Sequence, residues 1–95
     1  MRSLSLDVGD KRIGVALSDE TGTLASGLPT LARVGPRKDV RAVVELARVH
    51  DAGEVVVGLP RRLDGTVGPQ AEKVLAFMED LRRALRVPVL AWTSA

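Results

Sequence analysis

The residues with the clearest chemical potential lie near the start of the chain, in the segment Asp7-Val8-Gly9-Asp10-Lys11-Arg12. Asp7 ends an alternating stretch, and Gly9 follows in a turn where a missing side chain lets a phosphate-bearing ligand approach the backbone. This pattern is typical of metal-dependent nucleases, in which the carboxylate binds Mg²⁺ or Mn²⁺ against a scissile phosphate. It is also typical of ATPases, in which the carboxylate holds Mg²⁺ beside nucleotide phosphates. The alternative is purely structural: Asp7 caps the strand and Gly9 forms the turn.

Four basic residues are expected around Asp7. Lys11 and Arg12 occupy the first turn, and Arg61 and Arg62 follow the longest apolar run of the chain. The carboxyl ends of parallel strands open toward ligands at one edge of a sheet, so these four side chains are predicted to bind the phosphates of a nucleic acid. Ordinary solvated loop charge is the equally weighted alternative.

Hydrophobic spacing predicts the elements that position these residues. Leu4, Leu6 and Val8 alternate with polar residues and predict a strand whose opposite face carries Asp7. A second alternating stretch over residues 12–18 completes a hairpin with it. A weaker third strand is expected over residues 24–31, as an edge strand interrupted by glycine and proline.

The spacing then changes to that of a helix. Helices are predicted over residues 38–50, with Gly53 as the stop, and over residues 69–85, and strands over residues 55–59 and 87–92. The order is β-β-β-α-β-α-β. It predicts an α/β fold with a mixed five-stranded sheet.

The composition of this 95-residue chain excludes several classes of protein. The absence of cysteine rules out disulfides, thiolate metal sites and cysteine nucleophiles, and the single Trp and Phe are too few for a protein that stacks bases of single strands. The formal net charge of +2 is not itself a nucleic-acid signal. No apolar run approaches the ~18 residues of a membrane span, so we expect a cytoplasmic protein without a membrane partner.

Two motifs carry a resemblance to a known family. The stretch from Leu6 to Asp19 is similar to the first motif of the pre-16S rRNA nucleases, also described as Holliday-junction-resolvase-like. A second match runs through Val57-Gly58-Leu59-Pro60, Asp64-Gly65-Thr66, Gly68-Pro69-Gln70-Ala71 and Phe77. The resemblance covers nearly the whole chain and implies one ribonuclease H-like domain over residues 1–95. A ribonuclease H-like fold would require the order β-β-β-α-β-α-β, which is the order predicted above.

The resemblance also implies a chemistry. Asp7 would be the first catalytic and metal-binding carboxylate of a nuclease that uses Mg²⁺ or Mn²⁺ to hydrolyse phosphodiester bonds. The substrate would be structured RNA, most specifically the 5′ end of pre-16S rRNA in ribosome biogenesis, or branched DNA as in a resolvase.

The end of the chain departs from the family pattern. Family members continue from the last strand into an Asp-Glu-Arg motif, whose Glu is the second acid, and then into a C-terminal helix with a third. Here Thr93, Ser94 and Ala95 follow Trp92. Hydroxyls are poor ligands for Mg²⁺ or Mn²⁺, so we expect a domain truncated at its C-terminus, without that helix, that needs another subunit to be active.

Two functions of other classes stay open. One is a nucleotide-binding module of the actin and sugar-kinase type, whose phosphate hairpin also begins Asp-x-Gly. The other is a non-catalytic truncated domain that acts by binding nucleic acid or by self-association, because uncovered apolar surface attracts a partner. A two-fold homodimer is the simplest such assembly.

Overall fold

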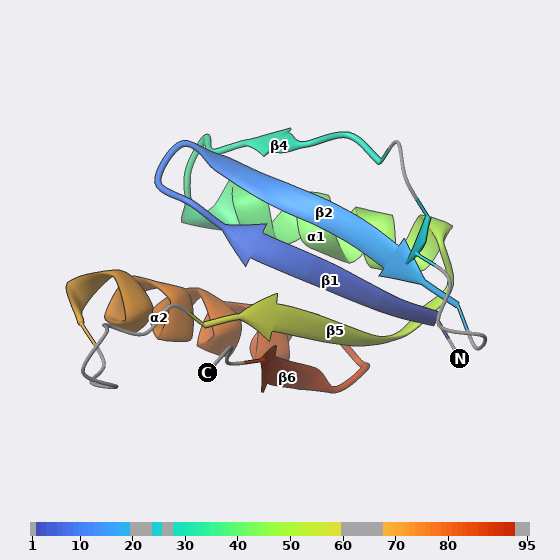
Figure 1. Ribbon diagram of the computed structural model, residues 1–95. Coiled ribbons are helices and arrows are strands. Elements are labelled where there is room, and N and C mark those ends of the chain that lie inside the picture. The colour runs from blue at the N-terminus through green and yellow to red at the C-terminus, as the bar shows by residue number, and fades with distance from the viewer. Residues whose placement is uncertain (1, 20–23, 26–27, 60–67, 93–95) are drawn as a thin grey trace.

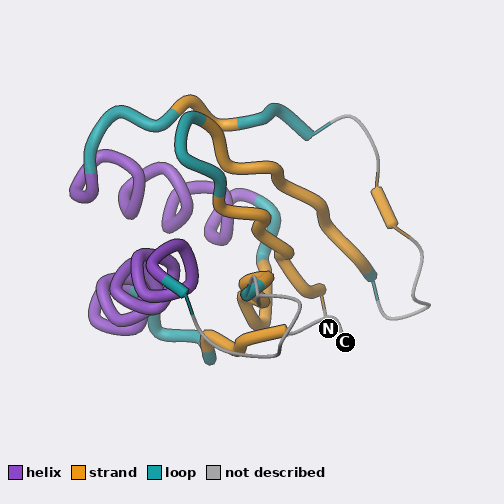
Figure 2. Tube along the Cα trace, turned by 60° about the vertical axis from the view of Figure 1, so that its left-hand side comes forward, coloured by secondary structure: helices purple, strands orange, loops and turns teal. Residues whose placement is uncertain are grey.

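The computed structural model describes residues 2–19, 24–25, 28–59 and 68–92. Figure 1 shows a mixed sheet whose strands run in the order β3-β2-β1-β5-β6, with β4 also paired to β2. Both helices lie on the same side of this sheet (Figure 2). We call the opposite side the open face, because no element of the described part of the chain covers it.

The predicted hairpin is confirmed. Strands β1 (Arg2–Val8) and β2 (Arg12–Ser18) pair antiparallel, with Leu4 opposite Leu17 and Val8 opposite Ile13. These apolar side chains are buried toward the helices, whereas Asp7 is exposed. Because neighbouring residues of a strand point to opposite faces, Asp7 lies on the open face, as its position in the alternation predicted.

The expected third strand is divided in two. Strands β3 (Leu24–Ala25) and β4 (Leu31–Ala32) both pair with β2, one near each end of it. Pro29 lies between them and has no N–H to donate to a ladder, which explains the break. The five-stranded mixed sheet is therefore confirmed, with its β3/β4 edge built from two short pieces.

The second half alternates helices and parallel strands, as predicted. It consists of α1 (Pro36–Val49), β5 (Ala52–Gly58), α2 (Pro69–Ala84) and β6 (Val89–Trp92). Strand β5 pairs in parallel with β1 on one side and with β6 on the other. Connections of this kind bring the carboxyl ends of β1, β5 and β6 to one edge of the sheet.

One detail of the sequence prediction is wrong. Gly53 does not stop α1, because it already belongs to β5. The chain turns at Asp51, which takes up a left-handed conformation with φ of 51°. Aspartate tolerates this conformation better than most residues because its short side chain can bond locally, and it therefore replaces the glycine expected there.

A single core lies between the sheet and the two helices. Its fully buried members come from both layers and are Leu4, Ile13, Val43, Val55, Val57, Val74, Met78 and Leu81. On the open face, by contrast, Leu90 and Trp92 remain 45% and 61% exposed. None of the helices in the described residues is long and apolar enough to cross a membrane.

Candidate active site

Asp7 lies near the end of β1, and its side chain is exposed to solvent. It lies opposite Gly14 in the β1–β2 register, and a side chain at Gly14 would contact Asp7 Cβ at 3.5 Å. The turn is closed by the Gly9 N–H, which donates to the Arg12 carbonyl oxygen over 2.8 Å. A Cβ atom at Gly9 would lie only 3.0 Å from that oxygen, so any side chain there would crowd the tight turn after Asp7.

The open face is hollowed beside Asp7. A shallow concavity of about 670 Å³ is lined by Ser5, Leu6, Asp7, Gly14, Val15, Ala16, Val56, Gly58 and Trp92. Among the described residues of this lining, Asp7 is the only ionisable one. The side chain has no hydrogen-bond or ion-pair partner among the described residues. The carboxylate is therefore free to accept hydrogen bonds or to attract a cation.

The structure describes two of the four predicted basic residues. Lys11 and Arg12 are both exposed in the hairpin turn and at the start of β2. Strand alternation puts Arg12 on the same face as Gly14, and hence on the face that carries Asp7. Arg61 and Arg62 lie outside the described residues, so the predicted ring of four bases stays a prediction.

The last strand ends at Trp92, beside the carboxyl end of β5. Trp92 is paired with Gly58, and both residues line the concavity that contains Asp7. Thr93 and Ser94, at the positions expected for family acids, lie outside the described residues. The topology places the end of β6 at the edge of the sheet where β1 also ends.

The described residues do not form a complete site for two divalent ions. No group of three histidine, cysteine, aspartate or glutamate residues in this part of the chain is placed to hold a metal. Mg²⁺ at phosphate sites takes one or two carboxylates together with substrate oxygens and water. Asp7 can supply one such carboxylate, but chemistry with two metals needs further ligands.

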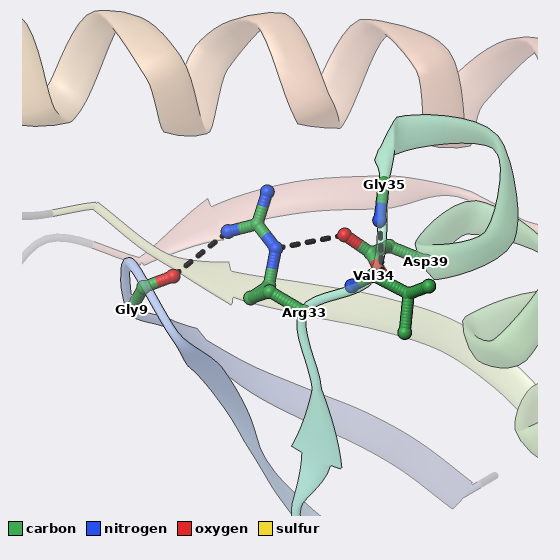
Figure 3. Close-up of polar contacts among 5 residues, drawn as sticks. All are labelled: Gly9, Arg33, Val34, Gly35 and Asp39. Atoms are coloured by element: carbon green, nitrogen blue, oxygen red, sulfur yellow. Dashed lines mark hydrogen bonds and ion pairs between the residues drawn. The ribbon is translucent and has the colours of Figure 1, made fainter.

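A buried ion pair behind the turn was not anticipated from the sequence. Arg33 donates from Nε to Oδ2 of Asp39 over 2.8 Å and from Nη1 to the Gly9 carbonyl oxygen over 2.8 Å (Figure 3). Its own main-chain N–H donates to the Lys11 carbonyl oxygen over 2.8 Å. The guanidinium also lies over the Phe77 ring, with Cζ 5.4 Å from the ring centre. Arg33 thus ties the turn after Asp7 to both helices.

Asp39 is held ionised by its surroundings. Burial raises the pKa of this carboxyl group, but hydrogen bonds from the Val34 N–H, the Arg33 side chain and the Gly35 N–H, together with the Arg33 charge, outweigh burial and lower the pKa. Oδ1 accepts the Val34 N–H over 2.9 Å, just before α1 begins. No sequence signal marks this arrangement except an acid in the first turn of a helix, which is common on helix dipole grounds alone.

Three other acids make structural contacts. Glu45 pairs with Arg48, and Glu79 pairs with Arg82, each three residues apart on an exposed helix surface. Glu54 accepts a hydrogen bond from the Ser3 hydroxyl across β1 and β5. These contacts leave Asp7 as the acid with the best access to a ligand on the open face.

Comparison with solved structures identifies the fold. The chain matches Thermus thermophilus RuvC with a TM-score of 0.67 at 18% identity, covering 98% of this chain and 64% of that one. It matches T. thermophilus RuvC in complex with a Holliday junction substrate with a TM-score of 0.65 at 19% identity, with the same coverage. These likenesses show a ribonuclease H-like fold, as predicted.

The chain belongs to the RuvX family, described as Holliday junction resolvase, whose family model matches residues 1–93. It is 50% identical to a protein of Caldanaerobacter subterraneus named as a pre-16S rRNA nuclease, over 97% of this chain and 66% of that protein. It is 42% identical to a protein of the same name from Clostridium acetobutylicum, over 97% of this chain and 68% of that one. The chain spans about two thirds of the length of these relatives.

The fold is also similar to that of a phosphatase. The Aquifex aeolicus Ppx/GppA phosphatase matches with a TM-score of 0.54 at 16% identity, covering 98% of this chain and 36% of that one. At this identity the likeness extends to the fold alone. The assignment to the RuvX family therefore rests on the sequence match, and the choice of substrate rests on further argument.

Proposed function

We propose that this chain carries the catalytic strand of a metal-dependent nuclease that hydrolyses phosphodiester bonds in structured nucleic acid. The substrate proposed is the 5′ end of pre-16S rRNA, by analogy with the names of its relatives. The observation that carries the proposal is Asp7, an exposed and unpartnered carboxylate on the open face, among the described residues. It lies at the carboxyl end of β1, beside the ends of β5 and β6.

The predicted site residues that the structure describes are Asp7, Lys11 and Arg12, and each has a role in this proposal. Asp7 offers a carboxylate for Mg²⁺ or Mn²⁺, the cofactor we propose, and further ligands come from the substrate and from outside the described residues. Lys11 and Arg12 bind phosphates on either side of the bond to be cut, because exposed cations next to the carboxylate offset the charge of an approaching backbone. Arg61 and Arg62 are proposed to extend that contact.

The direct test compares cleavage by the chain and by its Asp7→Asn variant. Substrates are an RNA that spans the 5′ boundary of 16S rRNA and a four-way DNA junction, each with Mg²⁺, with Mn²⁺ and with EDTA. We expect metal-dependent cleavage of the RNA that Asp7→Asn abolishes. Asp10→Asn is the matched control, because Asp10 is an exposed acid of the same turn and does not line the concavity beside Asp7.

The outcomes separate the alternatives. Preferential cutting of the junction favours a resolvase, and cleavage without metal, or equal cleavage by Asp7→Asn, contradicts the proposed role of Asp7. Binding without cleavage of either substrate favours the non-catalytic alternative. Binding of Mg-ATP at millimolar concentration, measured by calorimetry, favours the nucleotide-binding alternative.

We also propose that the chain forms a homodimer through the exposed apolar side chains of β6, the last strand in the order β3-β2-β1-β5-β6. Leu90 and Trp92 expose large apolar side chains there, close to Val56 in the register of β5 and β6. Exposed apolar surface of this kind favours association. Sedimentation should detect a dimer that Trp92→Ser weakens and Val49→Ser, an exposed apolar residue on α1, does not. A well-behaved monomer at high concentration contradicts the homodimer.

A further inference from the structure

A basic groove lies between the two helices, away from the candidate active site. It has a volume of about 620 Å³ and is lined by Pro36, Arg37, Val40, Arg41, Asp80 and Arg83. Three guanidinium groups therefore line the groove against one carboxylate. Arginine stays protonated at any physiological pH, so the positive charge of the groove is permanent.

The arginines of this groove differ from the others on the same helices. Arg48 and Arg82 are each neutralised by a glutamate three residues earlier in the helix. Among the described residues, Arg37, Arg41 and Arg83 have no hydrogen-bond or ion-pair partner. The unpaired arginines of α1 and α2 are thus gathered at the groove, where their hydrogen-bond donors are available to a ligand.

Two of these arginines, Arg37 and Arg41, are at positions where their charges do not stabilise α1. Arg37 lies in the first turn of α1, where the positive end of the helix dipole disfavours a cation, and Lys38 adds a second charge there. Arg41 follows Arg37 by four residues, a spacing at which like charges repel along a helix. Arg83, in the last turn of α2, is the only one of the three arginines whose place the dipole favours. Helix stability therefore does not explain the cluster.

The groove and the candidate active site lie on opposite sides of the molecule. The side chains of Asp39 and Val43 bury one surface of α1 against the rest of the domain, and Arg37 and Arg41 are on its exposed surface. Asp7 is on the open face, across the sheet from both helices. A ligand in the groove therefore leaves the concavity beside Asp7 accessible.

We propose that this groove binds backbone phosphates of a folded nucleic acid, as a second contact separate from the site at Asp7. Planar guanidinium groups bind phosphate oxygens in pairs, and three of them around one groove match several phosphates of a compact backbone. The domain measures 35 × 29 × 24 Å, so a folded substrate can contact both sides of it. The choice of nucleic acid as ligand rests on the proposed function.

The test measures binding without cleavage. Fluorescence anisotropy in EDTA follows the full chain binding to a labelled RNA hairpin and to a labelled four-way DNA junction, from 50 to 200 mM salt. The groove variant is Arg37→Gln with Arg41→Gln and Arg83→Gln. Its binding should weaken by about tenfold or more at the lowest salt, and the slope of log affinity against log salt should fall by about two to three. A larger effect on the hairpin assigns the groove to RNA, and a larger effect on the junction assigns it to DNA.

The control variant removes the same charge from elsewhere on the surface. It combines Arg2→Gln, Arg48→Gln and Arg82→Gln, in which Arg2 donates to the His50 carbonyl and the other two are paired with glutamates. Its salt slope should change by less than about one. The melting temperature of the groove variant should equal or exceed that of the wild type, because the substitutions relieve repulsion on α1.

The outcomes distinguish this inference from the proposed nuclease activity. Equal salt slopes for the groove and control variants overturn the inference, and so does a wild-type chain that binds neither nucleic acid. If the chain binds through the groove but does not cleave, the nuclease proposal fails and the groove assignment stands. If it cleaves and both variants bind alike, the nuclease proposal stands and the groove assignment fails.

Discussion

Arg33 and Asp39 form an ion pair of 2.8 Å that joins the start of α1 to the turn behind Asp7. The Asp39 side chain is 2% exposed and the Arg33 side chain 26% exposed, so the pair is largely removed from water. A buried charge is tolerated when it is paired. Removing one partner leaves the other charge buried and unpaired, which destabilises the folded state.

Replacing Asp39 with alanine should therefore destabilise the protein strongly. Arg33 would lose its counter-ion, and the N–H groups of Val34 and Gly35 would lose their acceptor at the start of α1. We expect a loss of about 3 kcal/mol in the free energy of unfolding, measured by urea denaturation. The control is Glu45→Ala, which removes an exposed pair and should leave the urea midpoint nearly unchanged. Equal effects of the two variants would contradict a special role for Asp39.

The same pair predicts how stability depends on pH. The pKa of Asp39 is lowered in the folded protein from its ordinary value of 3.8, because hydrogen bonds and the Arg33 charge outweigh burial. The unfolded chain therefore takes up a proton at higher pH than the folded one, and stability from Asp39 is present above 3.8 and lost as pH falls through the folded value. The difference in unfolding free energy between wild type and Asp39→Ala should thus shrink in urea titrations below pH 3.8. A difference that stays constant would contradict the lowered pKa.

Two glycines of the hairpin should respond differently to a methyl group. At Gly9 a Cβ atom would lie 3.0 Å from the Arg12 carbonyl oxygen, a main-chain atom held in the turn. At Gly14 the nearest contact is 3.5 Å, an ordinary separation. Gly9→Ala should cost about 1–3 kcal/mol in urea denaturation, because crowding of this kind displaces backbone, whereas Gly14→Ala should cost much less. If Gly14→Ala destabilised the protein more than Gly9→Ala, the close contact at Gly9 would not be the tightest in the hairpin.

The sequence allowed the element order and the face of Asp7 to be predicted because both follow from local patterns. Alternation in β1 and β2 depends on neighbouring residues, and the continuous apolar run of β5 marks it as an interior strand of the sheet, although Val56 faces the open side. The division of the third strand into β3 and β4 was harder to predict. Pro29 interrupts strand pairing, but it does not determine where the pairing begins again.

The Arg33–Asp39 pair was missed for a different reason. The two residues are six apart, and the third partner, the Gly9 carbonyl, lies 24 residues from Arg33. Such a contact depends on where the chain returns after β4, which no periodicity encodes. The same limit applies to the basic groove, because Arg41 and Arg83 meet only once α1 packs against α2.

The turn after α1 offers a further prediction. Asp51 adopts a φ of 51°, a conformation in which a Cβ atom crowds the backbone. Asp51→Val should cost about 1–2 kcal/mol, because a branched side chain is worse in this conformation, whereas Asp51→Gly should preserve or slightly raise stability. Thermal melts of the two variants compare them directly. A valine variant as stable as the glycine variant would contradict the left-handed turn at this residue.

Asp7 should be dispensable for folding. It is exposed, has no partner among the described residues, and lies opposite Gly14 rather than a charged residue. Asp7→Asn keeps its shape and should change the free energy of unfolding by no more than about 0.5 kcal/mol. A stable Asp7→Asn protein that has lost cleavage would place the residue in the chemistry. If the variant instead unfolds at clearly lower urea, any loss of activity would report on the fold, and the carboxylate would have a structural contact on the open face.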